Sequence, residues 1–116
     1  MAENLVELKK KQGIGIIMPE GEIVFENSNP LKKEVKNKIR KDEEIQKLIV
    51  NLELVSYLDS SGVGFLISLL KFMRQREGDM VITNLNDKVE RVIELTKLDG
   101  IIDIYGDTEE ALENLA

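Results

Sequence analysis

Residues 48–73, which read LIVNLELVSYLDSSGVGFLISLLKFM, hold the strongest structural signal in this chain. The first part, Leu48–Val55, begins with apolar side chains on both faces, as in a buried parallel strand, and then alternates. From Val63 onward most positions are apolar, which is typical of a largely buried helix, and Gly78 marks its end. The segment therefore predicts a buried strand followed by a buried helix.

The junction between these two elements, Asp59 to Gly64, is a candidate binding or regulatory site. Ligands of open α/β sheets gather at the carboxyl ends of strands, and a helix N-terminus suits an anion because its first amides lack partners. Asp59 or the hydroxyl of Ser60 or Ser61 can cap the helix, while Gly62 and Gly64 leave room for close approach by another molecule. The simpler interpretation, a plain cap with glycines that ease packing, stays open at this point.

The amino-terminal part of the chain predicts a hairpin and a helix. Leu5–Lys9 and Ile14–Met18 are expected to be strands joined by a turn at Gln12-Gly13. Asn29 is expected to cap the following helix, with Pro30 at its first position. The buried stripe of this helix has four-residue spacing and consists of Leu31, Val35 and Ile39.

The remaining sequence continues the alternation of strands and helices. Met80–Thr83 and Ile101–Tyr105 predict strands, Asn86 or Asp87 opens a helix, and Asp107 caps a last helix with Glu110 reaching back. We therefore expect one α/β domain over residues 1–116. Its mixed β-sheet has about five strands, a leading hairpin and then parallel strands, together with about four α-helices.

The composition excludes several kinds of active site. The 116 residues contain no Cys and no His, which removes thiol nucleophiles, Ser-His-Asp triads and the usual zinc ligand sets. No Lys follows the glycines of the junction, so it is not a phosphate-binding loop. We expect no enzymatic activity and no metal site, although the composition alone leaves a carboxylate-only Mg²⁺ or Ca²⁺ site open, without an EF-hand spacing.

The charge and hydropathy patterns indicate which classes of partner and which cellular location to expect. The net charge of −6, from 16 basic and 22 acidic side chains, argues against nucleic-acid binding. The basic run of residues 32–41 is most simply a solvated helix face, and no aromatic residues alternate with it. Met1–Asn4 lacks the pattern of a signal peptide, and no apolar stretch is long enough to span a bilayer. We expect a cytoplasmic protein without membrane contact.

The stretch Asn51–Gly64, NLELVSYLDSSGVG, resembles the signature of STAS domains, in particular of bacterial anti-sigma factor antagonists. Further matches are Gly21-Glu22-Ile23, Leu95–Asp99, Ile104-Tyr105 and Glu109–Leu112. The resemblance extends over about residues 5–115 and implies a STAS-type sandwich.

The resemblance also implies a partner-switching cycle. The serine that follows the aspartate, here Ser60, is expected to be phosphorylated, with Ser61 as a less favoured acceptor. The implied partners are an ATP-binding anti-sigma factor that is also a serine kinase, and a PP2C-type phosphatase. ATP and metal would belong to these partners, so the resemblance implies no cofactor for this chain. The unphosphorylated protein would bind the kinase and release a sigma factor, and we expect it to be a monomer or a weak dimer.

The implied partner-binding residues surround this serine. They are Glu22, Val24, Asn27, Ser28, Asp59, Ser61, Gly62, Gly64 and Asn84. For Glu22, Asn27, Ser28 and Asn84 the simpler interpretation, an ordinary turn or cap residue, is favoured over a role in the site. The family commonly has an aspartate at the position of Val24, so this departure concerns the identity of the partner and the efficiency of phosphorylation.

Two other functions are weighed against this one. A STAS module can belong to a stressosome-like scaffold or to a lipid-transport complex, which would be indicated by co-purification with a sensor array or a transport ATPase. An enzyme or nucleotide-binding protein would require nucleotide hydrolysis that is lost when Ser60 is replaced.

Overall fold

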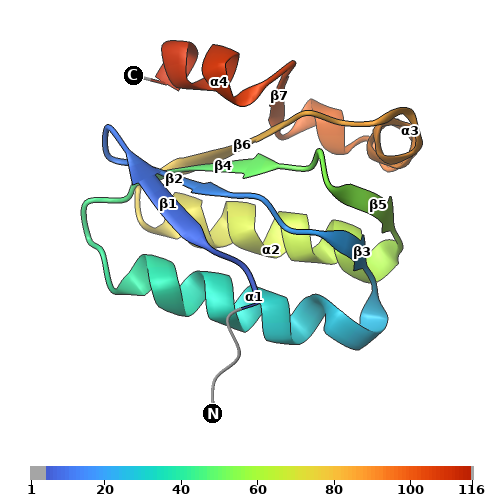
Figure 1. Ribbon diagram of the computed structural model, residues 1–116, viewed down its shortest axis with the longest axis horizontal. Helices are drawn as coiled ribbons and strands as arrows, with labels where there is room; N and C mark the ends of the chain where they lie inside the picture. The colour runs from blue at the N-terminus through green and yellow to red at the C-terminus, as the bar shows by residue number, and fades with distance from the viewer. Residues whose placement is uncertain (1–4, 116) are drawn as a thin grey trace.

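The computed structural model describes residues 5–115 of the chain (Figure 1). Residues 1–4, in which we expect no signal peptide, lie outside the described residues, as does residue 116. The strands are β1 (Leu8–Lys11), β2 (Ile14–Ile17), β3 (Gly21–Ile23), β4 (Lys47–Asn51), β5 (Val55–Leu58), β6 (Asp79–Thr83) and β7 (Asp103–Tyr105). The helices are α1 (Phe25–Arg40), α2 (Ser60–Gln75), α3 (Asp87–Leu95) and α4 (Thr108–Leu115), with a short 3-10 turn at Leu98–Gly100.

The main sheet has five strands in the order β1-β2-β4-β6-β7. Its first pair is the antiparallel β1–β2 hairpin, and every later neighbour is parallel. Each parallel crossover passes through a helix, as this topology requires. The predicted mixed sheet with a leading hairpin and four α-helices is confirmed for residues 5–115.

Helices cover both faces of this sheet, and each face has its own core. Helices α1 and α2 lie side by side on one face, and α4 lies on the other (Figure 1). The larger core includes the predicted α1 stripe of Leu31, Val35 and Ile39. The smaller core under α4 contains Ile14, Ile49, Val81, Ala111 and Leu112. The prediction of a largely buried α2 is confirmed, since seven of its residues are buried.

A second, two-stranded sheet is absent from the prediction. Leu48–Val55 is not one strand: β4 ends at Asn51, and the Asn51 side chain accepts a hydrogen bond from the Glu53 amide (2.9 Å) while the Val55 amide donates to the Leu52 carbonyl (3.0 Å). The chain turns there, and β5 pairs in parallel with β3. This pair lies past the carboxyl ends of β2 and β4, not beside an outer strand of the main sheet (Figure 1). This small sheet extends toward the start of α2 (Figure 1).

The predicted start of α1 was wrong. The helix begins at Phe25 with Val24 as its N-cap, so Asn29 and Pro30 lie inside it. The Asn27 side chain accepts from the Val24 amide and the Asp59 carboxylate accepts from the Phe25 amide, so the helix starts before the Asn-Pro signal. The first strand also begins later than predicted, at Leu8 and not at Leu5.

The caps of the later helices agree with the sequence. The Asn86 side chain accepts a hydrogen bond from the Val89 amide (2.9 Å), and the Asp107 carboxylate accepts one from the Glu110 amide (2.8 Å). These contacts confirm Asn86 and Asp107 as the caps of α3 and α4.

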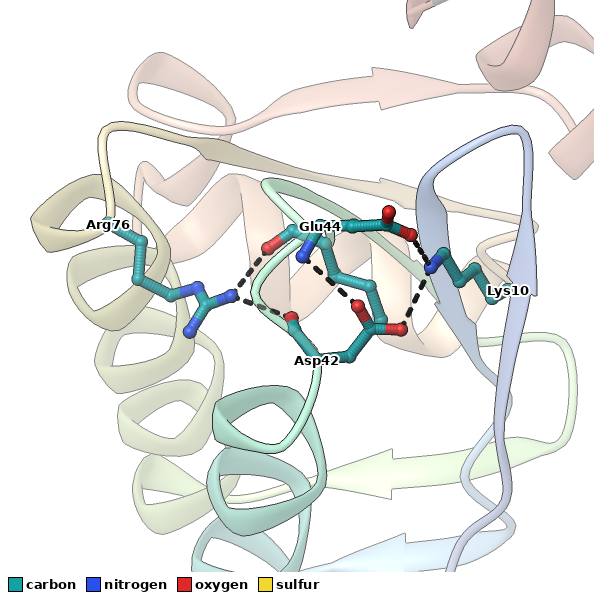
Figure 2. A network of polar contacts seen from close by, with 5 residues as sticks. Lys10, Asp42, Glu44 and Arg76 are labelled. Atoms are coloured by element: carbon teal, nitrogen blue, oxygen red, sulfur yellow. Dashed lines mark hydrogen bonds and ion pairs between the residues drawn. The ribbon is translucent and has the colours of Figure 1, made fainter.

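A polar network ties together the carboxyl ends of α1 and α2 (Figure 2). Arg76, which follows α2, donates to the carbonyls of Asp42 (3.0 Å) and Ile45 (2.8 Å). Lys10 of the hairpin pairs with the carboxylates of Asp42 (3.0 Å) and Glu44. Hydrogen bonds to Glu44 and then Asp42 raise the pKa of Lys10, whereas Lys10 and then the Glu44 amide lower the pKa of Asp42. The network fixes one end of the helix pair.

Candidate functional site

The candidate site lies at the opposite end of the same helix pair, where α2 begins. Asp59 follows β5 directly and is the N-cap of α2, with extended backbone angles. Ser60 is the first residue of the helix and is exposed, whereas Ser61 is half-buried. The structure therefore selects Asp59 as the cap, and the serine hydroxyls are not needed for that role.

The Asp59 carboxylate joins the starts of two helices. Its Oδ1 accepts a hydrogen bond from the Gly62 amide in α2 (3.0 Å), and its Oδ2 accepts one from the Phe25 amide in α1 (3.1 Å). Each amide belongs to the unsatisfied first turn of a helix, where a negative charge is favourable. The Asp59 side chain thus holds the first turn of α1 next to the first turn of α2, where Ser60 lies.

Asn27 braces the turn from β3 into α1. Its amide oxygen accepts from the Val24 amide (2.9 Å), and its amide nitrogen donates to the Glu22 carbonyl (2.7 Å). The Ser28 amide donates to the Val24 carbonyl (2.9 Å) as the helix begins. Glu22, Val24, Asn27 and Ser28 therefore belong to one turn, which Asp59 connects to α2. Their predicted role in partner binding stays a prediction.

The two glycines of α2 serve different purposes. A Cβ atom on Gly62 would lie 2.3 Å from the Ile23 carbonyl oxygen and 2.9 Å from the Leu58 side chain, so this glycine lets β3 and β5 approach the helix. A Cβ atom on Gly64 would have nothing within 4 Å. The expectation that both glycines leave room for another molecule therefore needs correction, because Gly62 is required by packing inside the protein.

A shallow groove of about 240 Å³ separates the first turns of α1 and α2. Its floor and walls combine hydroxyl, amide, ammonium and aromatic groups, and it is open on the side of Gly64. It is lined by Phe25, Ser28, Asn29, Lys32, Ser61, Gly64 and Phe65. Three residues predicted to contact the partner, Ser28, Ser61 and Gly64, are thus brought together.

Phe25 and Lys32 were not among the predicted site residues. A signal for Phe25 exists in the sequence, because it does not fall on the four-residue stripe of Leu31, Val35 and Ile39. An apolar residue off the buried stripe of a helix is expected to face solvent, and Phe25 does.

Asn84 makes its contacts at a different place. It follows β6 with a positive φ of 60°, and its amide nitrogen donates to Glu53 (3.3 Å) in the turn between β4 and β5. Its amide oxygen is buried and has no hydrogen-bond partner among residues 5–115. Asn84 does not line the groove beside Ser61.

The described part of the chain lacks the features of two other kinds of site. Between residues 5 and 115, no group of three or more acidic side chains is arranged to hold a metal ion. Over the same range, no helix has the length and apolar character needed to cross a membrane.

Comparison with known proteins identifies the family. The family model of the STAS domain matches residues 6–111. A relative from Thermotoga maritima, named as an anti-sigma factor antagonist, is 34% identical over 100 residues, which are 86% of this chain and 88% of the relative. A crystal structure of an anti-sigma factor antagonist from Thermotoga maritima matches with a TM-score of 0.86 at 33% identity, covering 94% of this chain and 92% of that one.

Structures of SpoIIAA, a Bacillus cell fate determinant, have the same fold. The unphosphorylated form matches with a TM-score of 0.79 and covers 95% of each chain. The phosphorylated form matches with a TM-score of 0.71 and covers 96% of this chain and 99% of that one. At 21% and 20% identity these matches concern the fold alone. Because the family model and the Thermotoga relative both match most of its length, this chain belongs to the STAS domain family.

Proposed function

We propose that the chain is an anti-sigma factor antagonist controlled by phosphorylation of Ser60. The name of the Thermotoga maritima relative supports this function. The choice of Ser60 rests on one observation at the start of α2. Ser60 is exposed, while the neighbouring Asp59 carboxylate is already bonded to two backbone amides. A kinase can reach Ser60 without opening the fold.

The unphosphorylated surface around Ser60 binds an anti-sigma factor that is also a serine kinase, and this binding frees a sigma factor. ATP and its metal ion belong to the kinase, and a PP2C-type phosphatase removes the phosphate. The chain itself acts by binding and not by catalysis, in the bacterial cytoplasm.

A single phosphate has enough charge to end this interaction. It adds about −1.5 to −2 charges at pH 7, next to the negative carboxylate of Asp59. The start of α2 offsets only about 0.3–2 kcal/mol of the cost. An unpaired charge buried in an interface costs about 2–5 kcal/mol, which corresponds to roughly 30-fold to several-thousand-fold in affinity.

The experiment compares Ser60→Ala with Ser60→Asp in binding to the anti-sigma factor kinase of the source organism. Ser60→Ala should bind in the presence of ATP without being released, and Ser60→Asp should bind weakly or not at all. Gln46→Glu adds the same charge at an exposed position outside the site and should bind like the wild type. Equal capture of Ser60→Ala and Ser60→Asp would contradict the proposal.

A further inference from the structure

Phe25 is the most exposed large apolar side chain among residues 5–115, at 78% of its accessible surface. It is the first residue of α1, and its ring stands beside the groove between α1 and α2. A single exposed apolar side chain is common on protein surfaces and by itself indicates nothing. Leu95, exposed to 76% at the end of α3, is such a case.

The connection to Ser60 distinguishes Phe25 from Leu95. The Phe25 amide donates to the carboxylate of Asp59 at 3.1 Å, and Asp59 immediately precedes Ser60. The Asp59 amide also donates to the Ile23 carbonyl (3.4 Å), which continues the pairing of β3 with β5 up to this point. The position of Phe25 relative to Ser60 is therefore set by two hydrogen bonds of the folded protein.

A kinase interface of ordinary size that is centred on Ser60 would also cover Phe25. The phosphoryl donor has to come within about 3–3.5 Å of the serine oxygen. A stable protein interface occupies about 800 Å² on each partner, which is a disc of about 16 Å radius. The path from Phe25 to Ser60 consists of one hydrogen bond of 3.1 Å, the short side chain of Asp59 and one peptide unit of about 3.8 Å, so Phe25 lies inside that disc.

The groove beside Phe25 indicates which chemical groups a partner would meet at this place. A Cβ atom on Gly64 would meet nothing within 4 Å, so the groove is open there, and the exposed Phe25 is one of its lining residues. Aromatic residues near the centre of an interface, buried in a pocket of the partner, supply much of the binding free energy. Lys32 adds one positive charge to the same groove.

We infer that Phe25 is the anchor of the kinase interface, and that the partner is a kinase with an apolar pocket beside its phosphoryl-transfer site. This inference rests on the proposed function. It assigns partner choice to Phe25, whereas Ser60 controls whether the complex persists. A kinase that presents a charged or filled surface at this place would not bind this chain.

The test measures the affinity of Phe25→Ala, Phe25→Tyr and Leu95→Ala for the kinase that captures the wild-type protein, with Ser60→Asp in parallel. Phe25→Ala should weaken binding by about 30-fold or more, as expected for a central aromatic residue. Phe25→Tyr, which keeps the ring but brings a hydroxyl into the apolar pocket, should bind more tightly than Phe25→Ala and more weakly than the wild type. Leu95→Ala removes an equally exposed side chain that does not line the groove and should bind unchanged.

Phosphorylation kinetics provide a second readout. Phe25→Ala should raise the KM of the kinase for this substrate and leave kcat unchanged, because an anchor contributes equally to the ground state and the transition state. Thermal unfolding checks that the variant is folded, which is expected for a side chain outside the core.

The two proposals fail in different ways. If Ser60→Asp abolishes binding but Phe25→Ala binds like the wild type, the anchor is wrong and the proposed function stands. If Ser60→Asp binds as tightly as the wild type, the proposed function is wrong whatever Phe25→Ala does. Equal loss for Phe25→Ala and Leu95→Ala would also overturn the anchor.

Discussion

Replacing Asp59 should show that one carboxylate caps two helices. Asp59→Ala removes the acceptors of both the Gly62 amide and the Phe25 amide. Asp59→Asn keeps one acceptor oxygen, which can still cap α2, but its amide nitrogen cannot accept from Phe25. Asp59→Ala therefore removes two hydrogen bonds, and Asp59→Asn removes one.

The expected magnitudes follow from the surroundings of each bond. Loss of an N-cap side chain costs about 0.5–2 kcal/mol, and the partly buried bond to Gly62 should lie in the upper half of this range. The bond to Phe25 is exposed and should contribute about 0.5–1 kcal/mol, nearer the lower limit for caps. We expect a loss of about 2 kcal/mol for Asp59→Ala and less than about 1 kcal/mol for Asp59→Asn.

Urea unfolding is the suitable assay. With an m-value of about 1–3 kcal/mol/M, Asp59→Ala should lower the midpoint by about 1 M at an unchanged slope. Asp107 is the matched control, because its carboxylate accepts one amide, that of Glu110. Asp107→Ala should cost about 1 kcal/mol and Asp107→Asn close to nothing. The reasoning would be refuted if Asp59→Asn were as stable as the wild type, since the bond to Phe25 would then contribute nothing.

Two further predictions concern the glycines and the polar network. Gly62→Ala should lower the free energy of unfolding by about 1–3 kcal/mol, because its Cβ would meet the Ile23 carbonyl at 2.3 Å. Gly64→Ala should raise the free energy of unfolding by up to about 1 kcal/mol, because its Cβ would have nothing within 4 Å and alanine favours the helix. Thermal unfolding that finds Gly62→Ala more stable than Gly64→Ala would contradict both predictions. Lys10 and then the Glu44 amide lower the pKa of Asp42, so the stability that this carboxylate contributes is present above its ordinary pKa of 3.8 and is lost as the pH falls through the lowered value. Asp42→Asn should therefore show a shallower loss of stability below about pH 4 in urea titrations at several pH values, and an unchanged slope would argue against the Lys10 contact.

The sequence predicted the fold where the pattern is strong and local. The buried strand, the apolar helix α2 and the caps at Asn86 and Asp107 follow from side-chain periodicity and capping chemistry within a few residues. The small sheet was not predictable in this way. Its two strands, Gly21–Ile23 and Val55–Leu58, are short and acquire their conformation by pairing with each other.

The prediction of where α1 starts was wrong for the same reason, because a contact between distant residues contributes to it. Asn29-Pro30 is a strong local start signal, but the first amide of α1, that of Phe25, bonds to Asp59, which is 34 residues away in the sequence. The position of Ser60 at a helix start was predictable, because it depends on the strand–helix junction alone. The groove was not, because it depends on how α1 and α2 meet.

The most direct test of the account is mass spectrometry of the intact protein and its peptides after incubation with the partner kinase and ATP. We predict one added phosphate, located on Ser60, and none on the Ser60→Ala variant. A phosphate on Ser61, on both serines or on neither would contradict the assignment of Ser60 as the switch.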